Sequence, residues 1–141
     1  MSPVTQQLSQ DARTRIDREV AKYPPDQKQS AVMAALAIAQ EEQGHLSNDV
    51  MNEVAGVLGM PAVAVYEVAS FYSMYDLAPI GRHKLCVCTN LPCALSGANE
   101  AADHLRKTLG IGFGETTADG RITLKEGECF GACGDAPVIL R

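Results

Sequence analysis

The chain has 141 residues, with 12 basic and 17 acidic side chains and a formal net charge of −5. This balance excludes a polycation that binds nucleic acid through phosphate contacts, and a hydrophobic share of 46% is typical of a globular protein. The apolar uncharged stretches 29–40 and 54–66 are shorter than the roughly 20 residues that span a bilayer, so no direct membrane insertion is expected. The first ten residues have no basic start and no apolar run, so no signal peptide is expected and the five Cys are predicted to lie in a reducing cytoplasm.

Charge and cysteine are unevenly distributed along the chain. Residues 1–80 carry 5 basic and 10 acidic side chains, whereas residues 81–141 carry 7 of each and contain all five Cys. The composition changes near Pro79-Ile80-Gly81. This change predicts two domains, a helical one at 1–80 and a smaller one at 81–141.

The first part is predicted to be helical. Its helices are expected at 11–22, 31–40, 47–58 and 61–70. Ser47 is a good N-cap, Gly44 and Gly59 end the helices before them, and Pro61 suits a first turn. The last two helices have the outline of a helix-turn-helix, but 61–70 contains no Arg, Lys, Asn or Gln to read bases. No nucleic-acid partner is therefore expected.

The second part alternates between strands and a helix. Short strands are predicted at 84–88, 121–124 and 137–140, and a helix at 98–109 is closed by Gly110. Asp119-Gly120 indicates a tight turn before the second strand. This order predicts a small α/β layer, so that the whole chain is α+β, with a helical bundle preceding the layer.

Four of the five Cys form two closely spaced pairs. Cys88 and Cys93 have the spacing C-x4-C, and Cys129 and Cys133 have the spacing C-x3-C. Each pair follows a predicted strand or lies in a Gly-containing loop, so two neighbouring loops can bring four thiolates together. Four thiolates suit zinc or an iron–sulfur cluster. Structural zinc usually takes tighter C-x2-C pairs, so the spacing favours a cluster over zinc and over incidental buried Cys.

The glycines beside the second pair also fit a cluster. Gly131 and Gly134 lack a Cβ, so their backbone N–H groups can approach the sulfur atoms, and such hydrogen bonds tune a cluster's potential. No acid, base or nucleophile constellation accompanies the cysteines. Catalytic residues are therefore not predicted in this chain.

Three segments of the second part are VCTNLPCA at 87–94, GETTADGRITL at 114–124 and GECFGACGDAPV at 127–138. In these segments the chain resembles the E-type subunit family of bacterial NADH:quinone oxidoreductase. This is the 24 kDa-type subunit of respiratory complex I. The resemblance extends upstream to 28–39 and 67–72. It implies a helical bundle followed by a thioredoxin-like domain that carries one [2Fe-2S] cluster. The ligands that it implies are Cys88, Cys93, Cys129 and Cys133.

The resemblance also implies a place in the respiratory chain. The chain would be an electron-transfer subunit beside the flavin- and NADH-binding subunit, with other peripheral-arm subunits as further partners, and would lie in the cytoplasm, peripheral to the inner membrane. It would belong to an NADH dehydrogenase without holding a catalytic site of its own. One alternative is the equivalent diaphorase-type subunit of an NAD-linked hydrogenase or formate dehydrogenase. Two alternatives from different classes are a structural zinc or interaction module and a thioredoxin-type dithiol protein. A thioredoxin-type protein usually has its two thiols at the spacing C-x-x-C, which is narrower than the spacing found here.

The sequence departs from this family at two points that bear on the site. Cys86 is an additional thiol outside the four-ligand pattern, and we expect it to be a small buried hydrophobe in the first strand. The chain stops at Arg141, where members of the family continue with another strand and a helix, so the fold is expected to be truncated at its C-terminus. The last strand is then expected to form a bare sheet edge.

Overall fold

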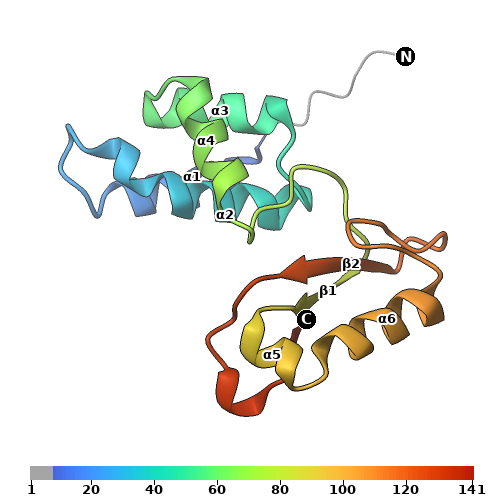
Figure 1. Ribbon diagram of the computed structural model, residues 1–141. Coiled ribbons are helices and arrows are strands. Elements are labelled where there is room, and N and C mark those ends of the chain that lie inside the picture. Colours follow the sequence, from blue (N-terminus) through green and yellow to red (C-terminus); the bar gives the residue numbers. More distant parts are fainter. Residues whose placement is uncertain (1–7) are drawn as a thin grey trace. The chain divides into compact units, whose positions relative to one another are not determined.

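The computed structural model describes residues 8–141, and the chain divides between Pro79 and Ile80 into two units (Figure 1). The elements of the first unit are α1 (Gln10–Val20), the short 3-10 helix η1 (Lys28–Ala31), α2 (Val32–Gln43), α3 (Asn48–Leu58) and α4 (Ala62–Phe71). Those of the second are β1 (His83–Cys88), α5 (Leu91–Leu95), α6 (Ala98–Leu109), β2 (Ile122–Gly127), the 3-10 helix η2 (Cys133–Asp135) and β3 (Ile139–Leu140).

Local chemistry explains where the helices of the first unit begin and end. The Ser9 and Ser47 hydroxyls accept hydrogen bonds from the backbone N–H groups of Ala12 and Val50, and so cap α1 and α3. Gly59 ends α3 in the left-handed conformation, with φ of +65°, which favours glycine. These ends agree with the predicted helices to within one to three residues.

Helix α2 is the centre of the first unit. It contacts α1, η1, α3 and α4, and its buried residues Ala35, Leu36 and Ala39 lie in one hydrophobic core with residues from all of them. The segment after α4 is tied to α2, because the Tyr75 hydroxyl donates to the Met33 carbonyl over 2.9 Å. Within residues 8–141 no single helix is long and apolar enough to cross a bilayer, although α3 and α4 together reach that length with a bend of 119° between them.

The second unit is built on a three-stranded sheet in the order β2-β1-β3. β1 and β2 are parallel, with Cys88 opposite Gly127, and β1 and β3 are antiparallel. A parallel pair needs a long connection, and α6 supplies it; α6 packs on β1, and both α5 and α6 lie on one side of the sheet (Figure 1). Val87, Ala102 and Leu124 form the core between the sheet and α6.

The structure confirms the α+β class and adds three details. The second strand continues to Gly127, and the last strand is only two residues long and lies at the sheet edge. The helix α5 is not predicted from the sequence, because five residues are too few for a helical period to show. The turn at Asp119-Gly120 is present, with Gly120 N–H donating to the Thr117 carbonyl over 2.8 Å.

Candidate metal centre

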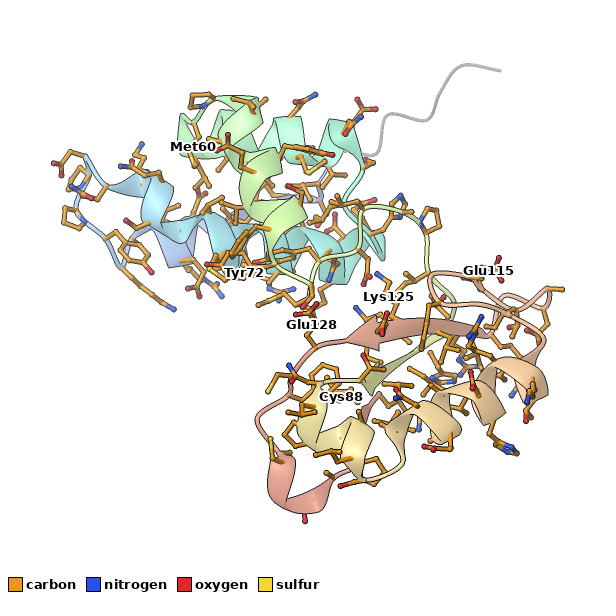
Figure 2. All side chains as sticks on the ribbon, in the orientation of Figure 1. Met60, Tyr72, Cys88, Glu115, Lys125 and Glu128 are labelled. Atoms are coloured by element: carbon orange, nitrogen blue, oxygen red, sulfur yellow. The ribbon has the colours of Figure 1, made fainter. Side chains whose placement is uncertain are left out.

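All four paired cysteines line one cavity of about 80 Å³. Cys88 is the last residue of β1, Cys93 lies in α5, Cys129 follows β2 and Cys133 begins η2. The parallel pairing of β1 with β2 brings the two loops to the same end of the sheet, and Figure 2 shows Cys88 at this end of β1. A water molecule needs roughly 10–15 Å³ by this measure, so the cavity has room for a group of several atoms.

The first loop is held from both sides by backbone hydrogen bonds. The Cys88 N–H donates to the Val138 carbonyl and the Thr89 N–H donates to the Gly127 carbonyl, both over 3.0 Å. Asn90 then caps α5, its side-chain oxygen accepting from the Leu91 N–H over 2.7 Å. Asn90 followed by a proline at the second helical position is the signal from which this short helix could have been found.

The two cysteine pairs differ in exposure. Cys88 and Cys93 are buried, with 3% and 2% of their surface exposed, whereas Cys129 and Cys133 are exposed. Gly131 adopts a left-handed backbone with φ of +70°, and its N–H donates to Cys129 Sγ over 3.4 Å. The expected approach of the Gly131 amide to a sulfur atom is therefore present.

The surroundings of Cys93 favour its protonated thiol. Burial raises the pKa of the Cys93 thiol, and its hydrogen bond with Cys88 raises it further, against a smaller opposing effect from the Val138 backbone. The Cys88 thiol donates to the Glu128 carbonyl over 3.5 Å. Since thiolates are the form that binds metal, loading this site releases protons.

The lining of the cavity suits an iron–sulfur cluster. Besides the four cysteines it consists of Asn90, Pro92, Phe130, Gly131, Ala132 and Val138, none of which is charged. Within residues 8–141, no three His, Cys, Asp or Glu side chains are close enough together to hold a single metal ion. A two-iron cluster does not need three side chains to meet at one ion, because each of its irons takes only two protein thiolates. The residues present therefore fit a [2Fe-2S] group.

Cys86 lies outside this cavity. It is opposite Lys125 of β2 and Leu140 of β3 in the sheet. Its side chain is partly exposed, so the expectation that it is buried was wrong. The short edge strand beside it explains the exposure, since Leu140 is itself 52% exposed and covers little of β1.

Comparison with known proteins agrees with this geometry. Residues 16–140 match the family described as thioredoxin-like [2Fe-2S] ferredoxin. This chain belongs to that family. The prediction of one [2Fe-2S] cluster on a thioredoxin-like domain is confirmed by this membership. The family match does not name the ligands, so the assignment of the four cysteines stays a prediction.

Curated relatives agree with the predicted host complex. An E-type NADH-quinone oxidoreductase subunit of Rhizobium meliloti is 49% identical, and the match covers 90% of this chain and 74% of that subunit. NADH-quinone oxidoreductase subunit 2 of Thermus thermophilus is 42% identical, and the match covers 92% of this chain and 71% of that subunit. NADH dehydrogenase [ubiquinone] flavoprotein 2 of Dictyostelium discoideum is 40% identical, over 54% of its length. The predicted resemblance to the E-type subunit of an oxidoreductase complex is confirmed.

Among solved structures, the chain resembles part of an NAD+-reducing [NiFe]-hydrogenase. The TM-score is 0.63 at 24% identity, over 74% of this chain and 18% of the hydrogenase chain. This likeness supports the fold.

Proposed function

We propose that this chain is the electron-transfer subunit of an NADH:quinone oxidoreductase, with one [2Fe-2S] cluster held by Cys88, Cys93, Cys129 and Cys133. The observation that carries the assignment is the arrangement of these four thiols around one uncharged cavity. Sequence likeness to NADH-quinone oxidoreductase subunits over most of the chain supports the choice of host complex.

The residues of the cavity determine how the cluster behaves. When bound, the cluster supplies a centre that accepts and donates one electron at a time. The Gly131 N–H is directed at Cys129 Sγ, and a hydrogen bond of this kind stabilises added negative charge on the sulfur. The uncharged lining keeps the local dielectric low around the buried pair, so each such bond has a larger effect than it would in water.

The proposed partners are the flavin- and NADH-binding subunit and other subunits of the peripheral arm, which places the chain in the cytoplasm at the inner membrane. A hydride delivers two electrons together, and a one-electron centre beside the flavin allows them to leave singly.

Exposed apolar side chains on and after α4 support docking through the helical unit; Phe71 is 79% exposed and Tyr72 is 37% exposed. We also propose 1–80 as the docking domain and 81–141 as the cluster domain.

A second candidate is the equivalent subunit of an NAD-linked hydrogenase. The fold likeness to an NAD+-reducing hydrogenase favours it, but the identity of 24% is well below the 40–49% found for the NADH dehydrogenase relatives. Co-purification from the native organism distinguishes the two hosts, since only the hydrogenase contains nickel.

The test of the function is anaerobic purification followed by metal and sulfide analysis. We expect two iron atoms and two sulfides per chain, a brown protein, and an electron paramagnetic resonance signal of a spin-coupled pair after reduction. The chain has no Trp, so its own near-ultraviolet band is weak and does not hide the cluster. Near-zero iron with stoichiometric zinc would show a structural zinc module instead.

A further inference from the structure

The loop that carries the exposed cysteines has one large side chain that points inward. Phe130 lies between Cys129 and Gly131, and its ring lines the cavity. It packs in the same apolar cluster as the buried residues Cys88, Cys93 and Ala98. A residue of the exposed loop therefore contacts the core around the buried pair.

The ring rests on a glycine that leaves room for it. Gly127 is the buried last residue of β2, and a Cβ added there would lie 2.9 Å from Cε1 and 3.2 Å from Cε2 of Phe130, and closer still to Cζ. The approaches to Cζ and Cε1 are closer than real Cβ atoms show, and the approach to Cε2 is tighter than most, so the ring would have to shift. Gly127 does not adopt a positive φ, so its backbone does not itself require glycine. The requirement comes from the ring.

The ring shares its apolar cluster with residues that follow the cysteine loop. Ala136 and Val138 pack against the same cluster, and the Val138 carbonyl is held by the Cys88 N–H. By contrast, three hydrogen bonds within the cysteine loop are local: Gly131 to Cys129, Asp135 to Ala132 and Ala136 to Cys133. Those bonds shape the loop but do not attach it to the buried pair.

We propose that Phe130, seated on Gly127, is a positioning residue that sets the exposed pair Cys129 and Cys133 opposite the buried pair and closes the inner side of the cluster to water. This inference rests on the proposed function and deepens it. Groups that orient metal ligands from behind typically change metal affinity by about 10–100-fold when they are removed. The pair Gly127–Phe130 is therefore expected to determine how firmly the cluster is retained.

The experiment compares five variants of the full chain: F130A, F130L, G127A, the double variant G127A/F130A, and F113A as the control. Phe113 is a second partly buried ring of the same unit, packed on the core beneath α6, with Arg106 over its face at 5.7 Å. Each protein is tested for far-ultraviolet circular dichroism, iron content, the rate of iron loss to a chelator, and the resonance g-values of the reduced cluster.

We expect F130A to lose iron about tenfold faster than the unmodified chain and to show shifted g-values, with F130L between the two. G127A alone should resemble F130A, because its Cβ displaces the ring. The double variant should be no worse than F130A, since the added methyl then occupies space that the ring has left. F113A should retain iron at the original rate and keep the g-values.

Two results would overturn the inference. The first is iron loss from F130A no faster than from F113A, and the second is additive effects of G127A and F130A. If F130A does not fold, the rates of iron loss from F130L and G127A are compared with that from F113A instead. If the unmodified chain binds zinc rather than iron and sulfide, the proposed function fails, but zinc release from the same variants still decides whether the ring positions the cysteine loop.

Discussion

Four cysteine side chains that line one cavity differ in their surroundings. The buried pair sits at the end of β1 and in α5, behind apolar residues, while the exposed pair lies in a loop that closes over it. Exposed thiolates are the more accessible to oxidants and chelators. At the scale of single residues, the site therefore has a protected half and a vulnerable half.

Alanine at each of the five cysteines separates ligands from the additional thiol. Cys86→Ala should keep the cluster and cost about 1 kcal/mol or less in stability, because the side chain is partly exposed and lies outside the cavity. Alanine at any of the four lining cysteines should abolish or badly destabilise the cluster, since one iron loses a thiolate. Iron per chain and the visible spectrum measure this. A colourless Cys86→Ala protein beside a brown Cys88→Ala protein would overturn the ligand assignment.

At the scale of elements, one glycine within helix α3 and another directly after its last residue have opposite structural roles. Gly56 lies in the exposed interior of the helix, with no atom within 4 Å of an added Cβ. Gly59 is equally open but ends the helix with a left-handed backbone. Space is the same at both positions, so backbone conformation alone distinguishes them.

This difference predicts opposite changes in stability. Gly56→Ala should raise the free energy of unfolding by about 1 kcal/mol, because alanine is the better helix former. Gly59→Ala should lower it by about 1 kcal/mol, because φ is positive there. Urea denaturation followed by circular dichroism measures both, and the iron content should be unchanged in each. Changes of the same sign would show that the end of α3 differs from the left-handed cap described above.

At the scale of the whole molecule, the cysteine site and Phe71, the most exposed aromatic side chain within residues 8–141, belong to different units. The second unit carries the cavity. The first exposes Phe71, Tyr72 and Met74 at and after the end of α4, with the first two rings edge-on at 5.0 Å between centroids. One unit thus offers an apolar surface for a partner while the other holds the proposed electron-transfer site.

Replacing Phe71 by Glu should weaken docking without affecting the cluster. A charged side chain in the apolar centre of an interface costs about 2 kcal/mol, roughly a thirtyfold loss of affinity. Co-purification with the flavin-bearing subunit and its dissociation constant measure the effect. Tyr23→Glu is the matched control, because Tyr23 is an exposed aromatic of the same unit outside α4. Undiminished co-purification of the Phe71→Glu protein would exclude docking through this surface.

Much of this protein follows from sequence alone, because the deciding chemistry is local. Ser47 and Gly59 mark the ends of α3 within their own neighbourhood of the chain, and Gly110 does the same for α6. Cysteine spacing and the surrounding segments were sufficient to predict the family and its [2Fe-2S] group. The helix ends need only residues that are close together in sequence, and the cluster was inferred from the spacing within each cysteine pair and from the resemblance of the surrounding segments.

Tertiary structure alone decided which cysteines are buried and what holds their loops in place. Burial depends on partners such as Val138, fifty residues after Cys88, whose contact no local pattern reveals. The same is true of Gly127, where the requirement for glycine comes from its contact with the ring of Phe130. Contacts of this kind exist only after the strands have paired, so the arrangement of the site is a property of packing rather than of any single segment.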